Sequence, residues 1–133
     1  MHRLKVATKG IIVVDQKGDA AAQASVRQGI MATQLKAGGW APADGQPGDA
    51  FATGQTVFVL RETGSPPDDP AVVRARDYLL RTQHADGSWR VESRVKVKAQ
   101  PYFENGDPHG EHQFLSTAAT AWATAALATL LTR

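Results

Sequence analysis

The chain carries one spaced pattern twice, and this repetition limits what it can fold into. Residues 34–40 read QLKAGGW and residues 83–89 read QHADGSW, so the pattern Gln-x3-Gly-x-Trp recurs after 49 positions. At that shift, seven of the 22 residues from 19 to 40 are identical to their counterparts, and one of these identities pairs two of the chain's three tryptophans. A fixed period of this length is typical of repeat proteins, in which each copy is one supersecondary unit.

A second match follows each tryptophan at a shift of 64, which pairs Thr53 with Thr117 and Thr56 with Thr120. Phe58 then pairs with Trp122. Because this shift exceeds the first one by 15, the second copy is expected to carry 15 extra residues between its tryptophan and its next helix.

Each copy is interpreted as a helix, a glycine-containing turn and a second helix. The clearest helix start is DDPAVVRARDYLLRTQ, where Asp68 or Asp69 can cap the first free amides and Pro70 suits the first helical position. The apolar spacing predicts helices near residues 19–36, 50–62, 69–84 and 114–131. The last of these has almost no charge and is expected to be buried on most sides.

The predicted organisation is a lead-in of residues 1–18, which can hold a strand, and a helical-hairpin repeat domain of residues 19–133. Copy one spans residues 19–62 and copy two residues 68–131. A chain of 133 residues suits one domain, and its net charge of +2, without interleaved aromatic residues, does not indicate nucleic-acid binding. No apolar run suggests a membrane span or a signal peptide, and the absence of cysteine leaves cytoplasm and periplasm both open.

The segments YLLRTQHADGSW and, more loosely, IMATQLKAGGW resemble the QW repeat of squalene–hopene cyclases, which protein prenyltransferases share in a weaker form. The resemblance covers residues 19–131. It implies an all-α fold of helical hairpins arranged as part of an α/α toroid, with the motif's Gln and Trp tying each hairpin to its neighbour. A terpenoid or other isoprenoid ligand would be in keeping with that family.

The residue chemistry suits a structural role for Gln34, Trp40, Gln83 and Trp89. A glutamine at a helix C-terminus can offer both its carbonyl and its amide to free backbone groups. A tryptophan six residues later can fold back over the glycine turn and cover that polar contact with an apolar face. The two tryptophans are therefore expected to fasten the repeat rather than to contact a ligand.

The catalytic groups that the resemblance would imply are absent. Hopene-type cyclases protonate substrate through Asp-x-Asp-Asp, which this chain lacks; its PPDDP segment, with Asp68 and Asp69, suits a helix cap. Prenyltransferases bind zinc through an Asp, a Cys and a His, and related thioester domains also need a Cys, but the chain has none. We therefore assign no catalytic residue, metal or cofactor, and enzymatic activity of the isomerase type stays open.

The insertion after the second tryptophan, residues 90–114, is the most individual segment. Alternation of Val91, Val95 and Val97 with basic residues predicts a short β-like stretch within residues 91–106. The following DPHGEH places His109 and His112 three apart beside carboxylates. This group could be an ordered loop that caps the next helix, a ligand contact, or a divalent-metal site. The candidate ligand-binding residues are Tyr102, Phe103, Asp107, His109, His112 and Trp122.

Two hairpins are too few to enclose a toroid interior, and repeat proteins generally need about three units for stability. The chain is therefore expected to form a homo-oligomer or to be part of a larger toroid protein. Its function is interpreted as a repeat module, non-catalytic alone, that acts in assembly or in binding an apolar or isoprenoid ligand. The alternatives are a piece of a cyclase-like isomerase and, with Glu104, Asp107 or Glu111 as acid and base, a carbohydrate-active protein.

Overall fold

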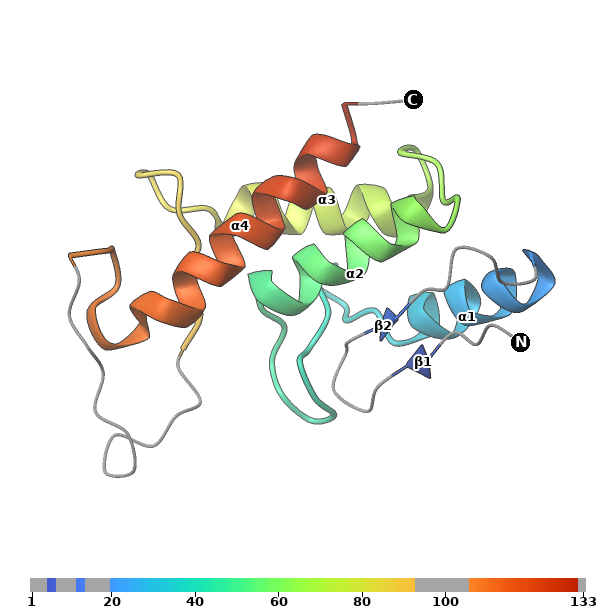
Figure 1. The fold of residues 1–133 in the computed structure, drawn as a ribbon, viewed down its shortest axis with the longest axis horizontal. Helices are drawn as coiled ribbons and strands as arrows, with labels where there is room; N and C mark the ends of the chain where they lie inside the picture. The colour runs from blue at the N-terminus through green and yellow to red at the C-terminus, as the bar shows by residue number, and fades with distance from the viewer. Residues whose placement is uncertain (1–4, 7–11, 14–19, 93–105, 132–133) are drawn as a thin grey trace.

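The computed structural model describes residues 5–6, 12–13, 20–92 and 106–131 (Figure 1). Two short strands, β1 (Lys5–Val6) and β2 (Ile12–Val13), pair antiparallel. The helices that follow form two successive pairs. They are α1 (Ala20–Ala32), α2 (Ala50–Glu62), α3 (Pro70–Thr82) and α4 (Gln113–Thr129), with the 3-10 turn η1 (Gly110–His112) directly before α4.

The second helices of the two pairs, α2 and α4, pack along each other, and α3 lies behind them against α2 (Figure 1). The backbones approach closely at Gly54, where an added Cβ would lie 2.7 Å from the Ala123 nitrogen and 2.7 Å from the Trp122 carbonyl carbon. Beside this point Phe58 and Trp122 meet edge to face, with ring centroids 5.8 Å apart. A glycine and a run of alanines thus allow the two helices to pack backbone against backbone.

Side-chain caps set the starts of two helices. Asp49 accepts a hydrogen bond from the Ala52 amide at 2.7 Å and begins α2, while Asp69 accepts from the Ala71 amide at 2.9 Å and begins α3. Of the two aspartates offered by the sequence, Asp69 is therefore the cap, and Pro70 takes the first helical position as predicted.

The all-α architecture is confirmed, but one helix boundary needs correction. The first helix ends at Ala32 and not near residue 36, because the chain turns there and the Thr33 hydroxyl donates to the Ile30 carbonyl. The last helix is buried or half-buried on most sides, but on one side every third or fourth residue is exposed. That exposed row consists of Phe114, Thr117, Ala121, Thr124, Ala128 and, just beyond the helix, Leu131.

The predicted β-like insertion near residues 91–106 is described only at its edges, since residues 93–105 lie outside the described residues. Val91 is buried but belongs to no strand; its amide donates to the Ser116 hydroxyl at 2.9 Å. Within the described ranges, no helix combines the length and apolarity that crossing a membrane requires.

Candidate functional site

The first glycine turn, residues 34–40, is closed by its tryptophan. The Trp40 indole is buried, and its Nε1 donates to the Ile30 carbonyl at 2.9 Å, on the last turn of α1. The Trp40 amide donates to Thr53 Oγ1 at 2.9 Å, on α2. One residue thereby connects the two helices of the first hairpin.

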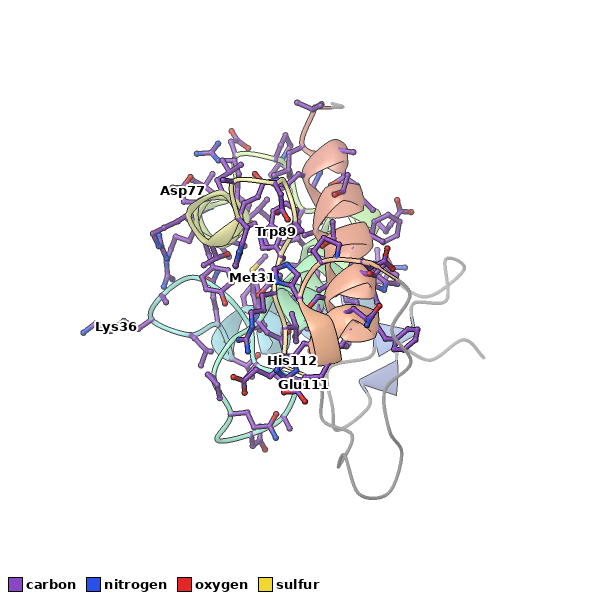
Figure 2. All side chains as sticks on the ribbon, turned by 90° about the vertical axis from the view of Figure 1, so that its left-hand side faces the viewer. Met31, Lys36, Asp77, Trp89, Glu111 and His112 are labelled. Carbon is purple, nitrogen blue, oxygen red and sulfur yellow. The ribbon has the colours of Figure 1, made fainter. Side chains whose placement is uncertain are left out.

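The second turn, residues 83–89, repeats these bonds. Trp89 Nε1 donates to the Leu79 carbonyl at 2.8 Å, and the Trp89 amide donates to Thr120 Oγ1 at 3.0 Å. Figure 2 shows the Trp89 ring between α3 and α4, in the interior of the hairpin. Each tryptophan thus bonds a carbonyl ten residues before it and a threonine on the following helix.

The equivalent threonines correct the predicted register of the last helix. Thr53 and Thr120 make the same bond, so the shift between the second helices is 67 positions and not 64. The second copy therefore carries 18 extra residues after its tryptophan. Phe58 and Trp122, which the shift of 64 makes equivalent positions, are therefore not equivalent. They contact each other edge to face where α2 packs against α4.

The glutamine of each pattern bonds across its own turn. Gln34 Nε2 donates to the Gly38 carbonyl at 2.8 Å and Gln83 Nε2 to the Gly87 carbonyl at 2.9 Å. Gln34 Nε2 also donates to the Ala71 carbonyl at 2.9 Å, near the start of α3. The first glutamine therefore holds the next hairpin as well as its own turn.

Two arginines of α3 complete the contact with the first turn. Arg74 donates to Gln34 Oε1 and to the Leu35 carbonyl, each at 3.2 Å, and Arg81 donates to the Ala37 carbonyl at 2.8 Å. Guanidinium groups suit this role because their several donors can reach adjacent carbonyls at once.

Between these arginines the ring of Tyr78 covers Gly39. A Cβ on Gly39 would lie 2.8 Å from Tyr78 Cε1 and 2.9 Å from Thr53 Oγ1, so no larger residue fits without rearrangement. Burial raises the pKa of the Tyr78 phenol, and the nearby Asp49 carboxylate raises it further. The first turn is thus enclosed between its own hairpin and the next one.

The second turn is open where the first is covered. Gly38 and Gly39 are buried, whereas the counterpart of Gly38, Gly87, is exposed and the counterpart of Gly39, Ser88, is half-buried. A groove of about 680 Å³ runs from this turn along α4. Its lining includes Gly87, Ser88, His109, Thr117, Ala121 and Thr124.

A polar cluster from the turn and the insertion borders this groove. Ser88 Oγ lies 2.6 Å from Asp86 Oδ1 and 2.7 Å from His109 Nε2. The His84 and His109 rings meet edge to face with centroids 4.9 Å apart. His109 has a φ of 81°, which is uncommon for a residue with a side chain, and its ring nitrogen contacts a hydroxyl 21 residues earlier.

The hydrogens in this cluster can be assigned from its chemistry. The Ser88 hydroxyl and amide both donate to Asp86, and these bonds, the hydroxyl's first, lower the pKa of the Asp86 carboxyl. With the single hydroxyl hydrogen directed at Asp86, Ser88 Oγ accepts from His109 Nε2 in the tautomer that carries a hydrogen on that nitrogen. In this arrangement the cluster joins the second turn to the loop that carries His109.

Of the predicted ligand candidates, Asp107 and His109 line the same groove beside the second turn, whereas His112 and Trp122 do not line it. Asp107 accepts from Thr117 at 3.5 Å, His112 lies 3.5 Å from Glu111 at the start of α4 (Figure 2), and His109 faces Ser88. Trp122 is half-buried against Phe58. Among the described residues no three His, Asp or Glu side chains are placed to hold a metal ion. Tyr102 and Phe103, with Glu104, lie outside the described residues.

Sequence reasoning did not single out Ser88, Asp86, Arg74, Tyr78 or Arg81 as contact residues. An Asp-Gly-Ser turn is recognisable locally, because aspartate commonly accepts from the amide two residues on. No local signal joins Ser88 to His109 or Tyr78 to Gly39, since both contacts depend on how the second hairpin packs.

Paired helices closed by a buried indole, and stacked through their second helices, define an α/α hairpin-repeat protein. Residues 11–82, more than half of the chain, match the family described as the squalene-hopene cyclase N-terminal domain, and the chain belongs to this family. The matched segment includes the first hairpin and α3. The comparison with curated proteins found no match. The predicted family resemblance and the toroid-type fold are thereby confirmed.

Proposed function

We propose that this chain is a toroid module that works by assembling with further helical hairpins and is non-catalytic by itself. The observation that carries this proposal is the difference between its two turns. The first turn is covered by α3 through Gln34, Arg74 and Tyr78, while the equivalent surface at the second turn is open.

The exposed row of α4 supports the same proposal. By the 67-position register, Ala121 is equivalent to Gly54 and Thr124 to Val57. Gly54 and Val57 are buried on α2, where the α4 backbone crosses Gly54. A helix that covered Ala121 in the same way would bury the largely apolar row that this chain exposes to water. Burial of apolar surface is the main driving force of association.

Light scattering during size-exclusion chromatography over a hundredfold concentration range tests the assembly proposal. We expect the mean mass to rise with concentration, and hydrogen exchange along residues 114–128 to slow in parallel. A monomer at every concentration, with exchange in these residues independent of concentration, would show that the chain does not assemble with itself in this way.

A second candidate, binding of an apolar ligand such as an isoprenoid, is favoured by another groove. This groove, of about 680 Å³, lies between α3 and the end of α4. Its lining includes Leu80, Trp89, Leu127, Leu130 and Leu131, with Arg76 and Gln83 as polar members. Binding of this kind would make the module part of a cyclase-like cavity.

Fluorescence titration with a soluble isoprenoid tests this second function. We expect saturable binding that weakens when Leu127→Ser reduces the apolar lining. The control Lys36→Ser, at an exposed side chain away from this groove (Figure 2), should leave binding unchanged. Equal binding by both variants would count against this groove.

A further inference from the structure

We infer that the partner is a second copy of this chain, whose α1 docks on the second turn as α3 docks on the first turn within one chain. This inference rests on the proposed assembly function and specifies the surfaces involved. The interface is therefore heterologous: the helix α1 of one copy meets residues 83–88 and the neighbouring groove of another.

The first step is the equivalence of α1 and α3. The 49-position repeat places one on the other, and each is followed by the same turn and tryptophan bond. The residues of α3 that face the first turn are Ala71, Arg74, Tyr78 and Arg81. Their counterparts on α1 are Ala22, Ser25, Gly29 and Ala32, all exposed and all small.

The second step is a reversal of sizes between the two turns. In the first turn, Gly39 leaves room for the ring of Tyr78. In the second turn the counterpart of Gly39 is Ser88, whose hydroxyl is bonded to His109, so the space above this position is partly filled. A tyrosine placed like Tyr78 would clash there, whereas its α1 counterpart, Gly29, would fit.

The third step is Gly29 itself, which the monomer does not explain. A glycine inside a helix destabilises it relative to alanine, because glycine loses the most conformational freedom on folding. Gly29 has no positive φ, and an added Cβ would meet no atom of the described residues within 4 Å outside its own helix. Close approach of another chain at this point would account for the absence of a side chain.

The second glutamine supplies a matching polar contact. The Gln34 amide donates to the Gly38 and Ala71 carbonyls, using both of its hydrogens. Gln83 donates to the Gly87 carbonyl in the same way. Its second hydrogen can therefore reach the carbonyl of Ala22 in the docked copy, because Ala22 is the counterpart of Ala71.

The docked helix lacks one feature of α3. Ser25 and Ala32 replace Arg74 and Arg81, so α1 cannot donate guanidinium bonds to the turn carbonyls. The interface between copies is therefore weaker than the contact within the chain, and the assembly is reversible. Because each copy offers both surfaces, association continues until a ring closes or a filament grows.

Gly29→Tyr tests this interface in the full chain, with Ala20→Tyr as the matched control. Ala20 is exposed on the same helix and lies nine residues away, half a turn round. We expect Gly29→Tyr to weaken self-association by about 30-fold or more, the effect of losing an interface hot spot. Ala20→Tyr should associate like the unmodified chain, and both should keep the helical circular dichroism of the monomer.

A rescue variant separates blocked docking from misfolding. Combining Gly29→Tyr with Ser88→Gly and His109→Ala recreates the size relation of Tyr78 and Gly39, and should restore part of the lost affinity. Self-association that survives Gly29→Tyr would overturn this interface while leaving the assembly proposal standing. An unmodified chain that stays monomeric would overturn pairing between copies, while assembly with hairpins of another chain would still stand. Loss of association without rescue would overturn the size argument.

Discussion

At the level of single residues, the two buried tryptophans carry most of the connection between helices. Each indole leaves no room for water beside the carbonyl that it bonds, since Trp40 and Trp89 are 4% and 2% exposed. If a buried carbonyl loses its hydrogen-bond donor, the folded state bears the full free-energy cost of having removed that carbonyl from water. The stability of a hairpin should therefore respond to the indole N–H as well as to the ring.

Trp89→Phe is expected to lower the free energy of unfolding by about 2–4 kcal/mol, because the Leu79 carbonyl loses its donor and the smaller ring leaves a cavity. Urea unfolding followed by circular dichroism measures this loss. Trp122→Phe is the matched control: that ring is half-buried and pairs edge to face with Phe58, so its loss should be about 1 kcal/mol. Equal losses at the two positions would contradict the proposed role of the Trp89 bond.

The Asp86 cluster should give the second turn a dependence on pH. Hydrogen bonds from the Ser88 hydroxyl and amide, and the charges of His109 and His84, hold the pKa of Asp86 below its ordinary 3.8. A lowered folded-state pKa contributes stability above the unfolded value and loses it as the pH falls through the folded one. We expect the exchange rate of the Ser88 amide hydrogen, divided by its intrinsic rate at the same pH, to rise below about pH 4.

Asp86→Asn provides the control for that measurement. The amide can still accept from Ser88 but has no charge to titrate, so the acid-dependent part of the exchange should disappear. An unchanged pH profile in this variant would mean that another group controls the turn.

At the level of elements, the distance between α2 and α4 is set by Gly54. Gly54→Ala would place a methyl group 2.7 Å from backbone atoms of α4, and backbone cannot move aside as a flexible side chain can. We expect a loss of about 1–3 kcal/mol, typical of overpacking. Gly29→Ala makes the same chemical change on α1, where no atom of the described residues outside the helix lies within 4 Å of the added Cβ, and should stabilise by up to about 1 kcal/mol.

Urea unfolding of these two alanine variants therefore gives changes of opposite sign. Both substitutions improve helix propensity by the same amount, so the difference between them isolates the crossing of α2 and α4. A stabilising effect at both positions would show that the helices can separate without cost.

The elements also show what the sequence could and could not predict. Capping residues and apolar spacing are local, so α2 and α3 were predicted within one or two residues and the repeat indicated two hairpins. The predicted register of α4 was wrong because threonines recur three and four residues apart in that helix. A shift of 64 aligns two pairs of threonines, whereas the shift of 67 aligns only one. Only the bond from Trp89 to Thr120 distinguishes the two.

The contacts between hairpins were beyond such local signals. Arg74 and Arg81 looked like the solvated face of a helix, and their bonds to turn carbonyls 39 and 44 residues earlier depend on the packing of α3. Likewise, the histidines of the insertion suggested a ligand set, but His109 lies against Ser88 and His112 beside Glu111. Residue type indicated polar contacts there without indicating their partners.

At the level of the whole molecule, the two ends of the repeat differ in how well they are covered. The first hairpin has the second packed against its turn and its second helix, while the second presents a largely apolar row to water. Binding between copies would stabilise the folded state by mass action, because unfolded chains cannot form the interface. The thermal midpoint should therefore rise with protein concentration.

Ala121→Arg tests this dependence at the centre of the exposed row. Ala121 is exposed, so the longer side chain extends into water in the monomer. In a dilute sample the substitution should therefore change the free energy of unfolding by no more than about 0.5 kcal/mol. In an assembly, a helix would cross Ala121 as α4 crosses the equivalent Gly54 within one chain. No side chain fits beneath the crossing helix at Gly54. Differential scanning calorimetry across concentrations should thus show a rising midpoint for the unmodified chain and a constant one for Ala121→Arg. A parallel rise in both would mean that association uses some other surface, because a buried, unpaired guanidinium could not be accommodated against this row.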